Sequence, residues 1–216
     1  MICRRTSQNR RAFTIIELLV IIAVLLLLAF GINFAANAKA RAIRMSCVNN
    51  LKQCDLAFAV WAGDNGEKFP MAVSTNEGGT LEWVQAGNAF RYFQVMSNEL
   101  STPMVTTCPS DKRTRSTNFT SDFKNTTVSF FVGIDASKAN PQGWLCGDRN
   151  ITNGFASKHS ILTLQGGQSL SWTREMHNQC GNVALVDGSV QQLSNRDLRR
   201  LMNTNAAWTS RIALPE

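Results

Sequence analysis

The hydrophobic and polar positions divide the chain into three stretches with different patterns. From Phe13 to Ala36 the sequence FTIIELLVIIAVLLLLAFGINFAA is apolar on every helical face and holds one charged residue, Glu17. A helix of these 24 residues is long enough to cross ~30 Å of hydrocarbon. The pattern therefore predicts a membrane-spanning helix over residues 13–36.

A second pattern follows over residues 37–65, where apolar positions recur at steps of three and four. This spacing places them on one stripe of a continuing helix: Ala40, Ile43, Cys47, Leu51, Cys54, Phe58 and Trp61. The opposite face is polar and carries Arg44, Asn49, Lys52, Gln53 and Asp55. The segment 63–66, Gly-Asp-Asn-Gly, tolerates left-handed backbone geometry and predicts the end of the helix. We expect its apolar stripe to dock a domain.

The third stretch, residues 66–216, predicts a small extracytoplasmic globular domain. Turn formers dominate up to residue 125, with one short helix expected around 89–93. Strand-length runs rich in β-branched and aromatic residues then begin, at Thr127–Val132 and Ser160–Leu164. Helices and short strands in this order predict the α+β class.

The clearest local signal lies within residues 182–193. Here Asp187 and Gly188 separate two strand-like runs, which predicts a β-hairpin with a two-residue type I′ turn. Ser194 follows and can cap a short helix. The apolar residues of that helix are Leu198, Leu201 and Met202.

Charge alters the first impression of a basic protein. The formal net charge is +7, but four arginines precede Phe13: Arg4, Arg5, Arg10 and Arg11. Without residues 1–12 the chain has 18 basic and 15 acidic side chains, a net charge of +3. Composition therefore gives little support to a nucleic-acid partner, and none is expected.

The cysteines predict disulfides in an oxidising compartment. Apart from Cys3 they lie at positions 47, 54, 108, 146 and 180, without a C-x-x-C pair that would indicate zinc. Cys47 lies on the apolar helical stripe, and Cys108 lies in a long irregular stretch that needs a tether, so we expect these two to bond. Cys146 and Cys180 each neighbour a glycine and are expected to form a second pair. Cys54 is then a buried thiol.

The N-terminal residues carry a family resemblance. Residues 11–17, Arg-Ala-Phe-Thr-Ile-Ile-Glu, followed by LLVIIAVLLLL, resemble the type III signal of type IV prepilins and type II secretion pseudopilins. The resemblance implies that a prepilin peptidase cuts between Ala12 and Phe13 and methylates the new amine. Ala12 stands where glycine is commoner. Glu17 matches the family's glutamate, which we expect to pair with the Phe13 amine of a neighbouring subunit, because a buried carboxylate needs a partner.

Other readings of this segment stay open. It also fits a plain membrane anchor, or a secretory signal cleaved after the Ala36-Asn37-Ala38 site. Insertion of a carboxylate inside an apolar run into a membrane costs ~2.5–3.5 kcal/mol on insertion scales. This cost suggests that Glu17 has a functional role, which neither alternative provides.

The globular part carries a second resemblance. It is similar to a large family of prepilin-type proteins with a C-terminal H-x9-DG segment, here His177 followed by Asp187 and Gly188. The other matching segments are Asn49–Gln53, Cys108–Asp111 and Gly147–Asn150. The resemblance implies a pilin-like α+β fold in which a long N-terminal helix packs on a small antiparallel sheet. It supplies no substrate and no catalytic residue.

Candidate chemistry centres on His177, Asp187 and Asp148. The turn alone explains Asp187, and His177 is expected to cap or bridge the hairpin. Asp148 and Asp187 are weak calcium candidates, since carboxylates ligate that ion. No H-E-x-x-H, G-x-S-x-G or phosphate-loop motif is present, so we expect neither enzyme activity nor a cofactor.

These observations predict a structural subunit of a type II secretion pseudopilus or a type IV pilus-like filament. We expect a single-pass inner-membrane protein whose N-terminus is cytoplasmic before processing, given the leader arginines, and whose domain is periplasmic or extracellular. Its partners would be the prepilin peptidase, other pilin or pseudopilin subunits and an inner-membrane secretion platform. The alternative is a monomeric membrane-tethered surface display or binding protein that uses the same export signal and recognises glycans or other surface ligands. For glycans, the rings that suit sugar stacking are Trp83, Trp144 and Trp172.

Overall fold

The computed structural model describes residues 13–154, 160–164, 169–203 and 210–215, and the side chains of 30–37 are outside this description. The predicted leader, residues 1–12 with Ala12 of the cleavage site, also lies outside the described residues. The chain divides into two compact units, Met1–Ala42 and Ile43–Glu216. Helix α1 (Ile15–Asp64) contributes to both, and each unit is described by itself.

In the first unit, α1 begins at a capping box. Glu17 Oε2 accepts hydrogen bonds from the backbone N and the Oγ1 of Thr14, both at 2.8 Å. The backbone N of Glu17 in turn donates to Thr14 Oγ1 at 3.3 Å. This reciprocal pattern satisfies two donors that a helix start otherwise leaves without partners. The predicted membrane segment thus has a locally stabilised start.

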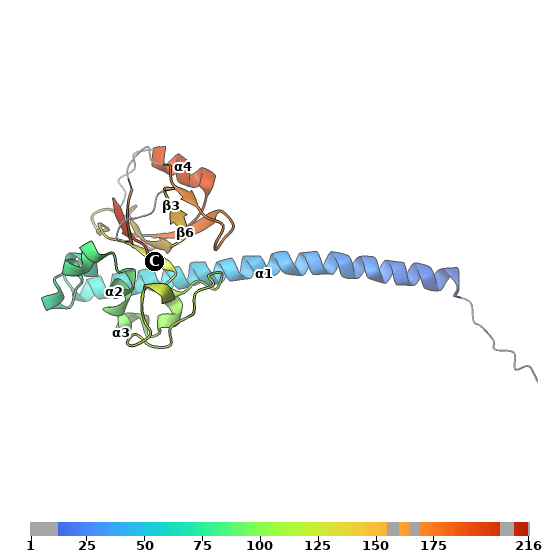
Figure 1. Ribbon diagram of the computed structural model, residues 1–216, viewed down its shortest axis with the longest axis horizontal. Coiled ribbons are helices and arrows are strands. Elements are labelled where there is room, and N and C mark those ends of the chain that lie inside the picture. The colour runs from blue at the N-terminus through green and yellow to red at the C-terminus, as the bar shows by residue number, and fades with distance from the viewer. Residues whose placement is uncertain (1–12, 155–159, 165–168, 204–209, 216) are drawn as a thin grey trace, which may run out of the picture. The chain divides into compact units, whose positions relative to one another are not determined.

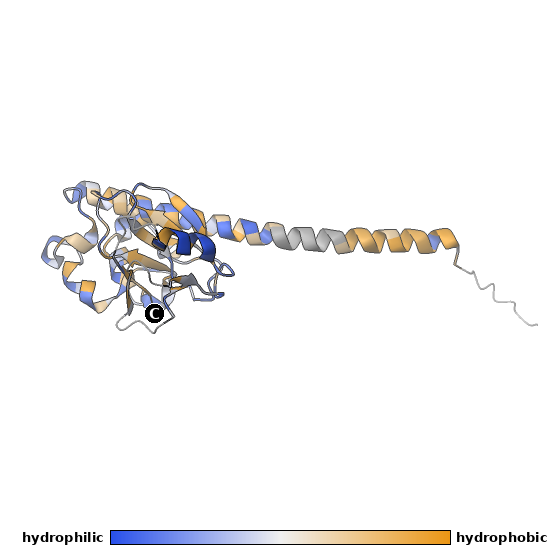
Figure 2. Ribbon diagram, turned by 90° about the horizontal axis from the view of Figure 1, so that it is seen from above, coloured by the Kyte–Doolittle hydropathy of each residue, from blue (hydrophilic) through white to orange (hydrophobic). Residues whose placement is uncertain are grey.

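Most residues in the first turns of α1 are hydrophobic, as the colours of Figure 2 show, with Glu17 as the one acidic residue of the first turn. Large apolar side chains are exposed from Ile15 to Leu28. Searched over the part of the chain that the structure describes, no helix has an apolar stretch long enough to cross a membrane.

In the second unit, α1 buries the predicted apolar stripe from Cys47 onward. Leu51, Cys54 and Phe58 are fully buried in the core. The helix ends at Asp64, followed by Gly66 at φ 64°, as the sequence predicted. Two positions differ: Ala40 is exposed, and Asp55, expected on the polar face, is buried. The reason for the second difference is the hairpin turn, since a Cβ placed on Gly188 would lie 3.5 Å from Asp55 Oδ2.

Short helices fill the stretch between α1 and the sheet. The helix predicted around residues 89–93 is α2 (Ala89–Gln94). Phe58 of α1 packs edge-on against Phe69 and Phe93, with ring centroids 6.1 and 5.9 Å apart. The remaining short helices are η1 (Pro70–Ala72), η2 (Thr75–Glu77), η3 (Leu81–Ala86), α3 (Ser97–Leu100), η4 (Pro103–Thr106) and η5 (Asn125–Thr127).

A six-stranded antiparallel sheet forms the centre of the second unit, in the order β4-β8-β1-β2-β6-β7 (Figure 1). Its strands are β1 (Phe130–Gly133), β2 (Trp144–Asp148), β4 (Ile161–Thr163), β6 (Cys180–Leu185), β7 (Val190–Ser194) and β8 (Arg211–Ala213). A two-stranded sheet pairs β3 (Ile151–Thr152) with β5 (Ser171–Trp172). The strand predicted from Thr127 starts only at Phe130, because η5 occupies residues 125–127.

The predicted hairpin is present as β6 and β7, but its turn differs from the prediction. Leu185 N donates to Ser189 O at 2.9 Å, and Gly188 N donates to Leu185 O at 3.0 Å. Gly188 has φ 87°, whereas Asp187 is not among the described residues with positive φ. The connection is therefore a three-residue turn with glycine in the left-handed position, and a type I′ turn is wrong.

The helix predicted after Ser194 is α4 (Asn195–Asn203), and it also begins at a capping box. Ser194 Oγ donates to Asp197 Oδ2 at 2.6 Å, and Asp197 N donates to Ser194 Oγ at 3.3 Å. Leu198 and Met202 of this helix are buried.

The core has two parts because the sheet is covered on both faces. Phe130 and Val132 of β1 belong to the cluster that contains the α1 stripe, whereas Phe131 between them belongs to the cluster that contains Leu198 of α4. This alternation follows from the period of two along a strand. In Figure 1 the docked part of α1 and α4 accordingly lie on opposite faces. The predicted α+β fold, a helix packed on an antiparallel sheet, is confirmed.

Candidate functional site

Four segments of the second unit bring Cys47, Cys108, Asp148 and His177 together, and we call these residues the disulfide–histidine cluster. Cys47 and Cys108 form a disulfide with Cα atoms 5.0 Å apart. His177 Nε2 lies 3.3 Å from Cys108 Sγ and 3.4 Å from Asp148 Oδ2. Both cysteines and Asp148 have no exposed surface, and the His177 side chain is 4% exposed. The cluster is therefore closed to bulk water.

Hydrogen bonds of the residues next to Cys108 hold its loop against α1. Asn50, one turn after Cys47, donates through Nδ2 to Thr107 O at 3.0 Å. The Oγ1 of Thr107 donates to Thr127 O at 2.8 Å. Ser110 N points at Cys108 Sγ from 3.4 Å. The loop is thus fixed on both sides of the cysteine before the disulfide adds its constraint.

Asp148 is the last residue of β2, and β6 supplies its donors. Its Oδ2 accepts hydrogen bonds from the backbone N of Asn182 at 2.7 Å and from Asn182 Nδ2 at 2.8 Å. Its buried Oδ1 has no hydrogen-bond partner among the described residues. Burial raises the pKa of Asp148 to about 7, against the Asn182 bonds and the charge of Arg44, which lower it. The carboxyl group therefore titrates near neutral pH.

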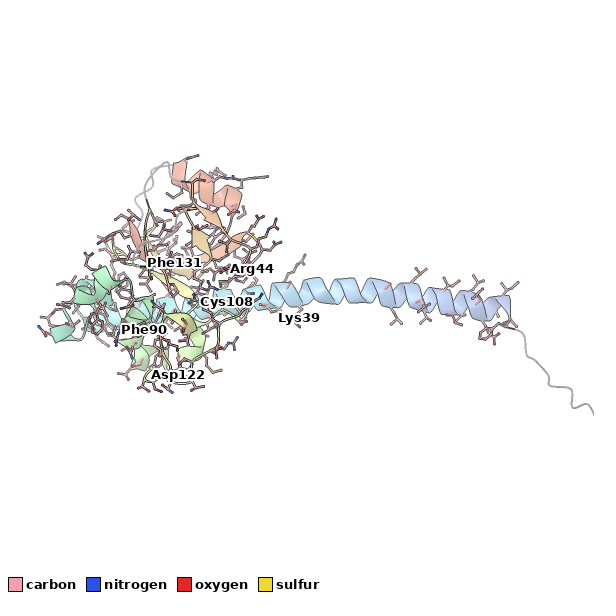
Figure 3. All side chains as sticks on the ribbon, viewed as in Figure 1. Lys39, Arg44, Phe90, Cys108, Asp122 and Phe131 are labelled. Carbon is pink, nitrogen blue, oxygen red and sulfur yellow. A yellow bond between two sulfur atoms is a disulfide. The ribbon has the colours of Figure 1, made fainter. Side chains whose placement is uncertain are left out.

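His177 reaches the cluster from a tight turn over residues 173–179. Gln179 N donates to Thr173 O at 3.1 Å, and both Asn178 and Gln179 have positive φ, 51° and 62°. Burial lowers the pKa of His177 to about 4, and the nearby positive charge of Arg44 adds to this effect. The imidazole is therefore neutral at physiological pH. Figure 3 labels Arg44 and Cys108.

An ion-pair network borders the cluster and ties its loops to one another. Arg149 donates to both carboxylate oxygens of Asp111, from Nε at 2.7 Å and from Nη2 at 2.9 Å. Its Nη1 donates to Glu175 Oε2 at 2.9 Å. Arg149 follows Asp148 directly, Asp111 follows Cys108 by three residues, and Glu175 precedes His177 by two. One arginine therefore links the three chain segments that meet α1.

The cysteine predictions have mixed outcomes. The Cys47–Cys108 disulfide is present and Cys54 is a buried free thiol, but Cys146 and Cys180 are both free. The strand register explains this error. Cys146 lies opposite Ala184, so Cys180 is four residues further along β6, ~13 Å away at the rise of a strand. That separation exceeds the Cα distance a disulfide can bridge.

The predicted His177, Asp148 and Asp187 constellation is only partly assembled. Asp187 lies beyond the other end of β6, five residues from the Asn182 that binds Asp148, which is ~17 Å along a strand. Its partners are Ser189 N at 2.9 Å and Gln142 Nε2 at 3.1 Å. The two aspartates therefore do not belong to one site, and calcium at either of them stays a prediction. The bridging of the hairpin turn by His177 is wrong, because its ring contacts Cys108 and Asp148.

Sequence reasoning singled out most of the segments at this site but missed three contributors. Arg44 was assigned to a polar helical face, yet it lies three residues before Cys47 and its Nε is buried. Asn182 and Glu175 carried no signal of their own. The spacing of three between Arg44 and Cys47 is the one pattern that indicates a shared helical face.

The processing site predicted by resemblance lies in the first unit. Phe13 is exposed, and the Glu17 carboxylate is engaged by Thr14 of the same chain. Phe13, Thr14 and Glu17 therefore all lie within the first turn of α1 or directly before it.

Comparisons with known proteins bear on this N-terminal segment alone. Residues 7–33 match the family described as the prokaryotic N-terminal methylation motif. No curated protein and no solved structure matches the chain. The chain thus carries a prepilin-type N-terminal signal, which implies processing by a prepilin peptidase and membrane-anchored export.

Proposed function

We propose that this protein is a pseudopilin-like structural subunit of a type II secretion pseudopilus or a related type IV pilus-like filament, and that it is not an enzyme. One observation carries the proposal: the methylation motif over residues 7–33 runs into a helix whose large apolar side chains are exposed from Ile15 to Leu28. Exposed apolar surface on this scale needs cover from lipid or from other protein chains.

The same surface serves two successive environments in this proposal. Before assembly, residues 13–36 anchor the chain in the inner membrane, with the globular unit periplasmic or extracellular. This step is supported by the sequence, which has a single charge over that segment. In the filament, neighbouring subunits cover the same helix. The partners are the prepilin peptidase, other pilin-like subunits and an inner-membrane secretion platform.

Glu17 has a local and an intermolecular role in this account. Within the chain its Oε2 carries both bonds to Thr14. During assembly the carboxylate pairs with the methylated Phe13 amine of a neighbouring subunit, because an uncompensated charge is costly in an apolar interface. The two roles need different properties of the side chain. Capping needs a hydrogen-bond acceptor, whereas the pairing needs a negative charge.

The alternative of a glycan-binding display protein loses its aromatic support. Trp144 and Trp172 are buried in the core, at 1% and 2% exposure. The ring of Trp83 lies beneath the guanidinium of Arg91, with Cζ 5.1 Å from its centroid. Trp144 and Trp172 therefore offer no free stacking face, and Arg91 covers one face of the partly exposed Trp83. With this support reduced, we propose the filament role.

A pair of substitutions tests the proposal. Glu17→Gln keeps an acceptor for Thr14 but removes the charge. Thr14→Ala keeps the charge and the backbone donor of residue 14 but removes the capping hydroxyl. We expect both variants to be inserted and cleaved. Glu17→Gln should be missing from sheared fibres, whereas Thr14→Ala should be incorporated. Normal incorporation of Glu17→Gln would contradict the charge-pairing role, and cleavage measured by intact mass separates a processing defect from an assembly defect.

A further inference from the structure

The disulfide–histidine cluster contains more metal-ligating atoms than a structural disulfide requires. Cys47 Sγ, Cys108 Sγ and His177 Nε2 all lie within 4.8 Å of one another. Asp148 Oδ2 lies 3.4 Å from the same imidazole nitrogen. We propose that reduction of the Cys47–Cys108 disulfide converts this cluster into a four-coordinate zinc site with these four atoms as its ligands.

The spacing fits tetrahedral zinc. Zinc binds sulfur at ~2.3 Å and nitrogen or oxygen at ~2.0–2.2 Å, so neighbouring ligand atoms in a tetrahedron are ~3.3–3.8 Å apart. The distances from His177 Nε2 to Cys108 Sγ and to Asp148 Oδ2, 3.3 and 3.4 Å, already fall in this range. Two movements complete the tetrahedron. The two sulfurs have to separate, which rotation about the Cα–Cβ bonds of the cysteines allows, and the Asp148 carboxylate, which lies outside the group of atoms within 4.8 Å of one another, has to approach them.

The charges of the site also balance. Two thiolates, one carboxylate and a neutral imidazole around Zn²⁺ give a formal charge of −1. Arg44, whose positive charge acts on both Asp148 and His177, neutralises that excess. A buried site is stable only when its net charge is compensated in this way.

Surrounding residues hold the non-sulfur ligands in place. Asn182 donates twice to Asp148 Oδ2, and Arg149 links the segments that carry Cys108, Asp148 and His177. Hydrogen bonds of this kind orient metal ligands and commonly raise metal affinity ~10–100-fold. The ligands come from α1, the loop after η4, the end of β2 and the 173–179 turn, so zinc would cross-link the segments that the disulfide joins now.

The conversion is balanced in electrons and protons. A dithiol reductant delivers two electrons and two protons to the disulfide and is itself oxidised to a disulfide, which leaves Cys47 and Cys108 as thiols. Zinc binding then releases the two thiol protons to solvent. A disulfide oxidant reverses the change: it accepts two electrons from the two thiolates and two protons from solvent, becomes a dithiol, and zinc is released as the Cys47–Cys108 disulfide forms. The loop that carries Cys108 is tethered to α1 in both redox states.

Cobalt titration of the full chain tests the proposal. The protein, in detergent and with Cys3→Ser to remove the leader thiol, is reduced anaerobically with a phosphine and titrated with Co²⁺. We expect one cobalt per chain, with the visible absorption of tetrahedral thiolate coordination, displaced by one equivalent of Zn²⁺. The oxidised chain should give no such absorption. His177→Gln should weaken binding more than ~100-fold, beyond what loss of a supporting residue produces.

Two further variants make the result unambiguous. Cys47→Ser with Cys108→Ser should abolish the absorption, whereas Cys54→Ala, which removes an equally buried thiol from the same helix, should leave it unchanged. Tryptophan fluorescence reports whether the reduced chain stays folded or refolds when zinc is added. Absence of tetrahedral cobalt in the reduced wild type, failure of zinc to bind a chain that has unfolded on reduction, or wild-type affinity in His177→Gln would each overturn the proposal.

Discussion

The parts of α1 before and after Ala42 share a backbone conformation but differ in what stabilises them. From Ile15 to Leu28 the large apolar side chains are 44–81% exposed. From Cys47 to Trp61 the apolar stripe is 0–6% exposed and belongs to the core of the second unit. The later part is stabilised by its own chain. The earlier part presents its apolar surface to something outside the chain, and this is why we assign assembly to it.

The contrast also explains the position of the disulfide. Cys47 is the first fully buried residue of the apolar stripe, so the covalent link lies where the docked part of the helix begins. A cross-link at that position fixes the helix to a loop 61 residues away in sequence. The earlier part of α1 has no such link among the described residues, in keeping with a segment that must exchange one environment for another.

Removal of the disulfide should have the largest effect on the second unit. Cys47→Ser with Cys108→Ser is expected to lower the free energy of unfolding by ~4 kcal/mol in the chain-entropy model, because it frees a long loop in the unfolded state. Chemical denaturation of the oxidised full chain in detergent measures this. Cys180→Ser, at a half-buried free thiol, should change stability by less than ~0.5 kcal/mol. Equal stabilities of the two variants would contradict a tether at Cys47.

Two matched leucines sharpen the comparison directly. Leu51→Ala, at a fully buried position, should cost the second unit ~3 kcal/mol through lost burial and a residual cavity. Leu25→Ala makes the same chemical change at a side chain that is 60% exposed, and it should leave unfolding of the second unit unchanged within ~0.5 kcal/mol. Denaturation monitored by tryptophan fluorescence decides. A similar loss in both variants would remove the distinction between the two parts of the helix.

Per pH unit, the smallest expected effect is a change in the pH dependence of stability at the cluster. The folded-state pKa is about 7 for Asp148 and about 4 for His177, whereas their ordinary values are 3.8 and 6.5. Between pH 4 and 6.5 the folded wild type holds a proton on Asp148 and the unfolded chain holds one on His177. The contributions of the two groups to the pH dependence of stability therefore cancel in the wild type. Arg44 and Asp111, the charged neighbours of these groups, are unchanged in the variants below.

Single substitutions should reveal the two contributions with opposite signs. In His177→Gln, only the folded state binds the Asp148 proton, so stability should rise as pH falls from 7 to 4. In Asp148→Asn, only the unfolded state binds the His177 proton, so stability should fall as pH falls from 6.5 to 4. Each slope is ~1.4 kcal/mol per pH unit for one proton. Slopes of the same sign would show that the two groups do not titrate as described.

The features that the sequence predicted correctly depend on local patterns. The end of α1, helix α2, the Asp187-Gly188 hairpin and the Ser194 cap all follow from periodicity or turn chemistry within about ten residues. The burial of Asp55 and the free thiols of Cys146 and Cys180 depend instead on the hairpin position and the strand register. A single sequence does not encode register in a local pattern, because it is set by pairing between distant strands.

Most residues of the disulfide–histidine cluster were predicted as candidates from the sequence, but the contacts among them were not. Cys47 and Cys108 were paired correctly because one lay on an inward stripe and the other in a loop without a tether. His177 was assigned to the wrong partner, because its spacing from Asp187 suggested contact with the hairpin turn. The turn at Asn178 and Gln179, where both residues have positive φ, directs the imidazole to the opposite end of β6. Neither residue is a glycine, so no local pattern predicted that conformation.

The mature N-terminus tests the central claim most directly. The chain recovered from membranes of the producing cell should begin at Phe13, with a methyl group on its amine, because residues 7–33 carry the methylation motif. Intact mass and mass spectrometry of the N-terminal peptide give the answer in one experiment. A mature chain that begins at Lys39, the product of cleavage after Ala38, would contradict the claim, since the exposed apolar part of α1 would then be a discarded secretory signal.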